Sequence, residues 1–124
     1  MYTRQFTIYD DSDQLQLIKG CLAQLKITEK AVSPKGVQYA INQAKCWMKE
    51  PHQLASYHVD LQEIYKTYQT ELIKNNAIDF GEIIIMTYRL FQSHPLILQK
   101  YQRLYHFVHV DEYQDTNRSQ YLLI

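Results

Sequence analysis

Three acidic side chains stand close together near the end of the chain, directly behind a short apolar run. The segment FVHVDEYQDTN, residues 107–117, places Asp111, Glu112 and Asp115 within five residues. Ligands in open α/β sheets bind at the carboxyl ends of the strands, where such acids would lie. There Asp111 could hold Mg²⁺ directly or through water, and Glu112 could orient and deprotonate a water for attack on a phosphate. Gln114 would follow on the next turn.

The same acids allow two other interpretations. A run of acids after an apolar segment can be a solvated turn that leads into a helix cap, and a bare Asp–Glu pair favours that interpretation. Alternatively, Asp111, Glu112 and Asp115 could catalyse metal-dependent hydrolysis, which would require a pocket and further ligands. Which of these interpretations is correct depends on the elements that position the acids and on the length of the sequence pattern around them.

Bulk composition gives few constraints. At 124 residues the chain is one domain or a piece of one. Thirteen basic residues balance thirteen acidic ones, so the composition gives no electrostatic indication of a nucleic-acid or membrane partner. No segment is long and apolar enough to span a bilayer, and the first residues lack the apolar core of a signal peptide. We therefore expect a cytoplasmic protein with no membrane partner.

Neither cysteines nor histidines show a metal-binding pattern. Cys21 and Cys46 are far apart in the sequence, and we expect both to be reduced and partly buried. Five histidines are scattered without the spacing of metal ligands, and we expect them to be structural or surface residues: His52, His58, His94, His106 and His109.

Helical periodicity dominates the chain before the acidic segment. We predict helices over residues 10–25, 33–48, 60–76 and 79–91, a short one that begins at Pro95, and a final one over residues 118–124. The expected N-caps are Ser12 or Asp11, Ser33 (followed by Pro34), Asp79, and Thr116 or Asn117. The expected apolar faces are Leu15, Ile18, Leu22 and Leu25; Val37, Ile41, Ala44 and Met48; Leu61, Ile64, Tyr65, Tyr68 and Leu72; and Phe80, Ile83, Ile84, Thr87 and Phe91.

The segment Phe107–Val110 breaks this pattern. It is short, β-branched and aromatic, and it predicts a strand buried on both faces, as in a parallel sheet. No other segment predicts a convincing partner strand, so we expect the end of the chain to be a fragment of something larger. The predicted fold class is mainly α, a compact helical subdomain of four to six helices followed by one short C-terminal strand.

The acidic segment also carries a family resemblance. FVHVDEYQDTN, followed by Gln120 and Tyr121, resembles motif II, the Walker B segment, of the UvrD/Rep family of superfamily 1 DNA helicases. That family commonly reads hydrophobic-V-D-E-[FY]-Q-D-T-N and then Q-Y. The upstream segments FTIYDDSDQLQLIKGCL, IYKTYQTELIKNNAIDFGEIII and HPLILQKYQRLYHF are also similar to the family, so that the resemblance covers essentially the whole chain.

The resemblance implies a division into two parts. Residues 1–104 would be the helical insertion subdomain 1B, and residues 105–124 would be a fragment of the RecA-like motor domain 1A, a P-loop NTPase domain. Some positions depart from the family pattern. Gly81 stands where an acid or alanine is usual, His109 replaces an apolar residue, and Leu104 and Tyr105 replace Arg/Phe-type residues. None of these departures touches the acidic pair.

The resemblance also implies a function. The parent protein would be an ATP-dependent DNA helicase that couples ATP hydrolysis to translocation on single-stranded DNA and duplex unwinding, in DNA repair or replication. Asp111 would bind Mg²⁺, Glu112 would be the catalytic base at the same metal site, and Gln114 would sense the γ-phosphate of ATP and couple it to the DNA-binding groove. Asp115 would orient the loop. The partners would be single-stranded DNA, single/double-strand junctions and the remaining helicase domains.

Two questions stay open at this point. No G-x-x-x-x-G-K-[ST] motif occurs in the sequence, so we expect the isolated chain to be inactive as an ATPase. The alternative is a stand-alone helical module that binds DNA or a protein without nucleotide chemistry. Four lysines could contact DNA phosphates, although ordinary solvated lysines are favoured: Lys35, Lys45, Lys49 and Lys66. Trp47 could stack on a base, although packing in the core is favoured. The DNA-binding residues are therefore not assigned.

Overall fold

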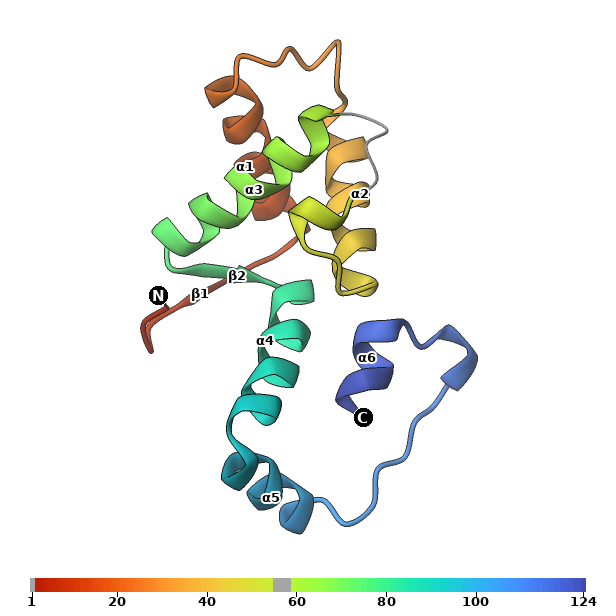
Figure 1. The fold of residues 1–124 in the computed structure, drawn as a ribbon. Helices are drawn as coiled ribbons and strands as arrows, with labels where there is room; N and C mark the ends of the chain where they lie inside the picture. The colour runs from red at the N-terminus through yellow and green to blue at the C-terminus, as the bar shows by residue number, and fades with distance from the viewer. Residues whose placement is uncertain (1, 55–58) are drawn as a thin grey trace.

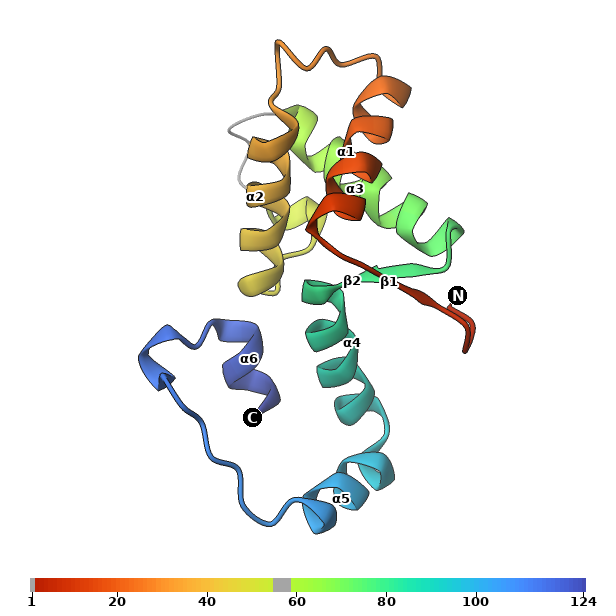
Figure 2. The same ribbon diagram turned by 180° about the vertical axis from the view of Figure 1, so that it is seen from behind.

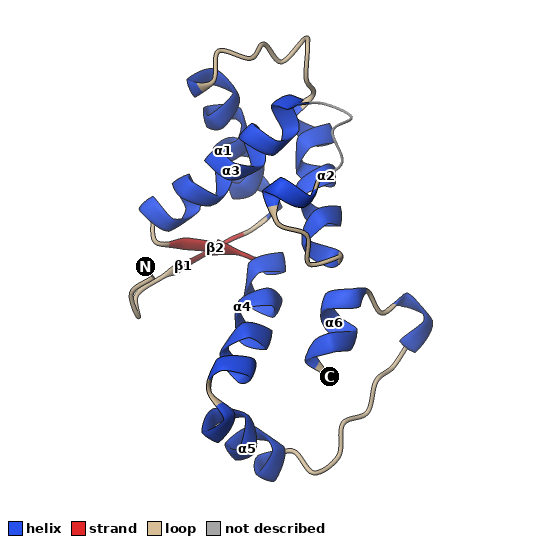
Figure 3. Ribbon diagram, in the orientation of Figure 1, coloured by secondary structure: helices blue, strands red, loops and turns tan. Residues whose placement is uncertain are grey.

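The computed structural model describes residues 2–54 and 59–124. In these residues the chain is mainly helical, as the sequence predicts, and contains six α-helices and two short strands (Figure 3). The helices are α1 (Asp11–Gln24), α2 (Pro34–Cys46), α3 (Val59–Lys74), α4 (Phe80–Ser93), α5 (Pro95–Leu104) and α6 (Arg118–Leu123). The strands are β1 (Thr7–Tyr9) and β2 (Ala77–Asp79), and 3₁₀ turns occupy Pro51–Gln53 and Tyr113–Asp115.

The elements of the described residues form two groups (Figures 1 and 2). Helices α1, α2 and α3 pack together with β1 and β2 along one side, and we call these five elements the helical body. Helices α4 and α5 lead away from it, and residues 105–112 return in an open arc to α6. Helix α6 packs against α4 and the end of α2. The compactness predicted for residues 1–104 therefore applies to the helical body and not to α4 and α5.

The core lies between α1, α2 and α3, where the predicted apolar faces meet. Burial of these side chains is the main favourable term for folding. The prediction for residues 60–76 is confirmed most fully, because four of its five apolar positions are buried there. The largest buried apolar side chains of the core are Ile18, Leu22, Ile41, Ile64, Tyr65, Tyr68 and Leu72.

Three predicted helix caps are confirmed. The Ser33 hydroxyl accepts the backbone N–H of Gly36 at the start of α2, and Pro34 occupies the first helical position. Asp79 caps α4, and Asn117 caps α6. A side-chain oxygen at each cap satisfies a backbone N–H that has no partner inside the helix.

The cap of helix α1 lies one or two residues earlier than predicted. Its cap is Asp10 and not Ser12 or Asp11, because the Asp10 carboxylate accepts the Asp13 N–H at 2.8 Å and the Asp13 carboxylate accepts the Asp10 N–H at 3.2 Å. This reciprocal pair is a capping box, and an aspartate at the third helical position completes it.

The predicted apolar face of α4 is wrong, because Ile83, Ile84, Thr87 and Phe91 are only partly buried. Phe80 is 57% exposed, and the buried side chains of this helix are Glu82 and Ile85. The reason is an ion pair that periodicity alone does not reveal. Glu82 binds the ammonium group of Lys45 on α2, so the face of α4 that carries Glu82 turns toward α2.

The predicted C-terminal strand is also absent. Phe107–Val110 is irregular, and in the described residues the one sheet contains only β1 and β2. Phe107 is 84% exposed, so the segment is not buried on both faces. A parallel strand needs a neighbour on which to form its hydrogen bonds, and among the described residues no strand pairs with this segment.

Strands β1 and β2 were not predicted from the sequence pattern. They pair in parallel, with Thr7 opposite Ala77 and Tyr9 opposite Asp79. Each strand has three residues, which is too short for an alternating pattern to stand out. The pairing ties the N-terminal segment to the residues that lead into α4.

Among the described residues, no helix is both long and apolar enough to cross a membrane.

Candidate functional site

The backbone of the acidic segment makes a tight turn at Glu112. This residue has φ 49° and ψ 44°, in the left-handed region, and the 3₁₀ turn Tyr113–Asp115 follows it. The Asp115 N–H donates to the Glu112 carbonyl at 2.9 Å. Among the residues that the structure describes, three other non-glycine residues have a positive φ, and each closes the end of a helix, a common use of this conformation: Lys26, Met48 and Asn76. Glu112 closes no helix, and strained residues of this kind cluster at functional sites.

The turn brings together three of the predicted site residues. Asp111 Oδ1 accepts the Glu112 N–H at 2.9 Å, and Gln114 Nε2 donates to Glu112 Oε2. All three side chains are exposed to solvent. The amide of Gln114 thus holds the carboxylate predicted to be the catalytic base, an arrangement that sequence spacing alone did not establish.

The donor set of this turn suits Mg²⁺ that is shared with phosphates. Carboxylate oxygens are the ligands that Mg²⁺ prefers, and the ion is usually held by one or two carboxylates, waters and substrate phosphates. Among the described residues, no three His, Cys, Asp or Glu side chains are grouped to hold a metal ion. Asp111, Glu112 and Asp115 therefore do not form the metal cluster that the hydrolase interpretation requires.

Two shallow hollows flank the turn. One contains the acids Asp111, Glu112 and Asp115 together with apolar residues at the end of α6. The other contains Gln114 and a group of exposed aromatic and basic side chains, which come from the end of α2, the 3₁₀ turn and α6: Trp47, Tyr113, Arg118 and Tyr121. Gln114 and Glu112 are hydrogen-bonded to each other, so the turn connects the two hollows.

Asn117 anchors the turn to the rest of the chain. Its side-chain oxygen accepts the Gln120 N–H at 3.0 Å and the Ser119 hydroxyl at 2.8 Å, while its own N–H donates to the Gln120 side chain. Its Nδ2 donates to Cys46 Sγ at 3.3 Å, on the last residue of α2. Asn117 therefore both begins α6 and connects it to the helical body.

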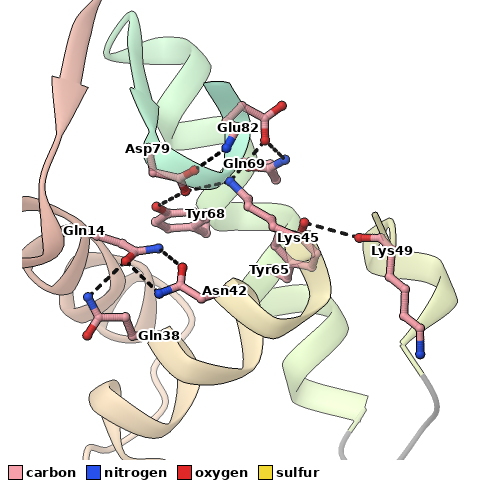
Figure 4. A network of polar contacts seen from close by, with 10 residues as sticks. All are labelled: Gln14, Gln38, Asn42, Lys45, Lys49, Tyr65, Tyr68, Gln69, Asp79 and Glu82. Carbon is pink, nitrogen blue, oxygen red and sulfur yellow. Dashed lines mark hydrogen bonds and ion pairs between the residues drawn. The ribbon is translucent and has the colours of Figure 1, made fainter. Parts of the chain in front are cut away.

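A buried charge cluster surrounds Lys45, the residue that precedes Cys46 (Figure 4). Lys45 Nζ lies 2.6 Å from Asp79 Oδ2 and 3.1 Å from Glu82 Oε2, and the Lys45 side chain is 1% exposed. The Tyr68 hydroxyl donates to Asp79 Oδ2 at 2.7 Å, and Gln69 donates to Glu82. Burial, reinforced by the Asp79 carboxylate, raises the pKa of Tyr68, so its hydroxyl keeps its proton and remains a donor.

The sequence did contain a signal for this cluster. Lys45 falls on the apolar face of α2, one turn after Ile41 and beside Ala44. A charged residue on a buried face implies a buried partner, because an unpaired buried charge is very costly. The partner could not be identified, since Asp79 is 34 positions away.

The structure corrects the interpretation of Lys45 and Trp47. Lys45 is neither a phosphate contact nor a solvated lysine, because its ammonium group is enclosed between two carboxylates. Trp47 is 59% exposed at the end of α2, so it is not packed in the core. The other three candidate lysines are exposed, as expected of solvated side chains: Lys35, Lys49 and Lys66.

Gly81, one of the departures from the family pattern, has a local reason. A Cβ atom at this position would lie 3.0 Å from Lys45 Cδ and 3.1 Å from Lys45 Cβ. These distances are shorter than ordinary carbon contacts. The missing side chain of Gly81 therefore leaves room for the stem of Lys45 to reach the carboxylates.

The cysteines fit their predicted state. Both are free thiols, Cys21 buried in the core and Cys46 partly buried beside Asn117.

A second polar cluster joins α1 to α2 (Figure 4), where Gln14 is bound to Asn42 and Gln38. This cluster holds α2 one and two turns before Lys45, and together the two clusters fix the position of the helix.

Comparison with known proteins agrees with the motif. The UvrD/REP helicase N-terminal domain family matches residues 1–124. The ATP-dependent DNA helicase PcrA of Bacillus subtilis is 39% identical over 126 residues, which cover 98% of this chain and 17% of that protein. The PcrA proteins of Staphylococcus aureus and Leuconostoc citreum are 38% and 36% identical over the same shares. The chain thus spans about a sixth of the length of these curated relatives. On the full-length family match and these identities, the chain belongs to the UvrD/REP helicase family.

Proposed function

We propose that this chain is part of an ATP-dependent DNA helicase, in which Asp111, Glu112 and Gln114 serve ATP hydrolysis. The observation that carries the proposal is the turn at Glu112. It presents two adjacent carboxylates and an amide on an exposed surface, in a chain whose relatives are named ATP-dependent DNA helicases. The parent protein would use ATP and Mg²⁺.

The three residues have distinct roles in this proposal. Asp111 would hold Mg²⁺ with the carboxylate oxygen that does not accept the Glu112 N–H. Glu112, also beside the metal, would accept a proton from the attacking water. Gln114 orients the Glu112 carboxylate through its amide and would respond to the γ-phosphate. Bound Mg²⁺ would neutralise negative charge on the phosphates during transfer.

The division of the chain is part of the same proposal. Residues 1–104 would be the helical insertion 1B, and residues 105–124 would belong to the RecA-like motor domain 1A. Support comes from Phe107–Val110, which leaves Phe107 84% and Val108 61% exposed in an extended segment without a strand partner. A β-branched and aromatic segment in this state suits pairing with strands of a larger sheet.

The proposal extends to partners and a cellular role. The parent protein would act on single-stranded DNA and on single/double-strand junctions, together with the remaining helicase domains, in DNA repair or replication in the cytoplasm. It would couple hydrolysis to translocation along the single strand and to unwinding of the duplex. The relatives are named ATP-dependent DNA helicases, which supports DNA and ATP as ligands. The strand, the junction, the pathway and the compartment rest on the resemblance of residues 107–117 to motif II.

A grafted protein provides the test. The matching segment of the Bacillus subtilis relative is replaced by this chain, and DNA-stimulated ATP hydrolysis is measured. Glu112→Gln should lower kcat by at least about 100-fold, the usual contribution of a general base. Glu63→Gln, at an exposed position on α3, is the matched control and should leave kcat unchanged. Equal rates for the two variants would refute the role of Glu112.

The isolated chain gives a second test. We expect no ATP hydrolysis above background, because positioning and charge stabilisation of the phosphates need parts that these residues do not supply. Hydrolysis that Glu112→Gln abolishes would contradict this expectation. Salt-dependent binding of tailed duplex DNA, with no effect of Mg²⁺ and ATP, would instead favour the binding-module alternative.

A further inference from the structure

In the part of the chain that the structure describes, the acidic turn is attached to the helical body on its C-terminal side. Before it, Phe107–Val110 makes no strand pairing with the helical body. After it, Asn117 connects to α2 and α6 packs against α2 and α4. Figure 1 shows the resulting arrangement, an open arc that ends in a docked helix. The position of Asp111 and Glu112 relative to the helical body is therefore set by the attachment at Asn117.

We propose that Asn117 is a positioning residue, which fixes the acidic turn on the helical body through its hydrogen bond to Cys46. The proposal rests on the proposed function, since it assigns Asn117 a part in ATP hydrolysis through the acids of the turn. Asn117 touches neither acid and is not a catalytic residue.

The hydrogen bonds of Asn117 leave its side chain little freedom. Its Oδ1 accepts from Ser119 and Gln120, which fixes the direction in which its Nδ2 points. Its Nδ2 reaches Cys46 Sγ at 3.3 Å. Helix α6 has only six residues, and a helix of that length is marginal without tertiary contacts. The attachment therefore contributes to holding both α6 and the turn that precedes it.

Cys46 is itself held firmly. It follows Lys45, whose ammonium group is bound to Asp79 and Glu82 at the start of α4. A continuous set of contacts therefore runs from the start of α4 through Lys45 and Cys46 to Asn117. By this path a shift of α2 relative to α4 would reach the acidic turn.

Asn117→Ser separates the two tasks of the residue. Serine is as good a helix cap as asparagine, but its short side chain has no amide to reach Cys46. The rate of Cys46 alkylation in the isolated chain measures how often the attachment opens. We expect about a fivefold increase, which corresponds to a hydrogen bond of about 1 kcal/mol. Amide hydrogen exchange of residues 118–124 should increase by a similar factor.

Two controls belong to this experiment. Ser33→Asn makes the converse cap exchange on α2 and should leave Cys46 alkylation unchanged. Cys21, which is buried in the core, should remain unreactive in every variant. Unchanged Cys46 alkylation and unchanged exchange of residues 118–124 in Asn117→Ser would overturn the proposal.

A rescue in the grafted helicase tests the consequence for catalysis. Asn117→Asp keeps the cap but removes the donor, and we expect kcat for ATP to fall several-fold with KM within about twofold. Adding Cys46→Ser should restore kcat, because a serine hydroxyl can donate to the new carboxylate. Cys46→Ser alone should be nearly neutral, since the hydroxyl can also accept from Asn117.

The outcomes distinguish the two proposals. A residue that only caps α6 predicts normal kcat in Asn117→Asp and no effect of adding Cys46→Ser, and that result would refute the positioning role. The alkylation and exchange measurements involve no ATP, so they decide whether the attachment exists even if Glu112→Gln proves harmless. A harmless Glu112→Gln would count against the proposed function alone.

Discussion

Replacement of Lys45 by methionine tests whether the buried charge cluster holds the start of α4 against α2. Methionine has a similar length and no charge, so it can follow the same path past Gly81. The substitution leaves the carboxylates of Asp79 and Glu82 without their cation, at side-chain exposures of 4% and 9%. Two like charges would then remain in a buried site.

The expected cost is large. Removing one partner of a buried ion pair usually destabilises a protein by about 3–5 kcal/mol, because the remaining charge is uncompensated. Asp79 keeps the Tyr68 hydroxyl and the Glu82 N–H as donors, so we expect a value near the lower end, about 3 kcal/mol. For a chain of this size that loss corresponds to a fall in Tm of roughly 10 °C.

Urea unfolding followed by circular dichroism gives the free energy directly. Lys35→Met, at an exposed position of the same helix, is the matched control and should change stability by less than about 0.5 kcal/mol. The triple variant Lys45→Met/Asp79→Asn/Glu82→Gln should recover much of the loss, since it removes the uncompensated charges. A loss in Lys45→Met no greater than in Lys35→Met, or a triple variant less stable than Lys45→Met, would refute the reasoning.

Three further predictions concern single positions. Gly81→Ala should lower stability by about 1 kcal/mol, because the new Cβ would lie 3.0 Å from the side chain of Lys45. This loss is expected although alanine is the better helix former. A Tm at or above that of the unchanged chain would show that the Lys45 side chain can move aside. Burial raises the pKa of the Cys21 thiol to about 11, so little thiolate forms at pH 8 and alkylation there should modify Cys46 well before Cys21, as mass spectrometry of the peptides can check. Phe107→Lys should reduce any self-association in sedimentation measurements at constant Tm, whereas a clear fall in Tm would mean that this side chain packs in the monomer.

Local signals predicted most of the helices and caps. Ser33 with Pro34, and Asp79, mark helix starts because their side chains act on N–H groups within the same turn. The apolar face of α3 followed from spacing alone, and Tyr68 and Leu72 are fully buried as predicted. These features depend on neighbours within a few residues, which is the range over which a sequence pattern carries information.

The errors arose where a distant partner decides. Glu82 turned inward, and Phe80 outward, because Lys45 on another helix binds Glu82. Phe107 lies in an irregular segment, since strand structure depends on a neighbouring strand as well as on residue type. At the candidate site the sequence predicted the cap at Asn117, and the roles of the acids stay a prediction. The bond from Asn117 to Cys46 could not be predicted, because it joins residues 71 positions apart.

Two adjacent residues at the end of α2 connect this helix to different parts of the chain: Lys45 to the start of α4, and Cys46 to Asn117 before α6. Successive side chains on a helix point about 100° apart, so Lys45 can face Asp79 and Glu82 while Cys46 faces Asn117. A buried ion cluster adds little net stability compared with well-packed apolar residues, so stability alone is a weak reason to place three charges here. The cluster is more specific in its effect on geometry, because its ion pairs form in one arrangement of α2 against the start of α4. Helix α6 packs on both of these helices, and the acidic turn directly precedes α6. The charge cluster therefore fixes the relative position of α2 and α4, the two helices on which α6 and the acidic turn before it are placed.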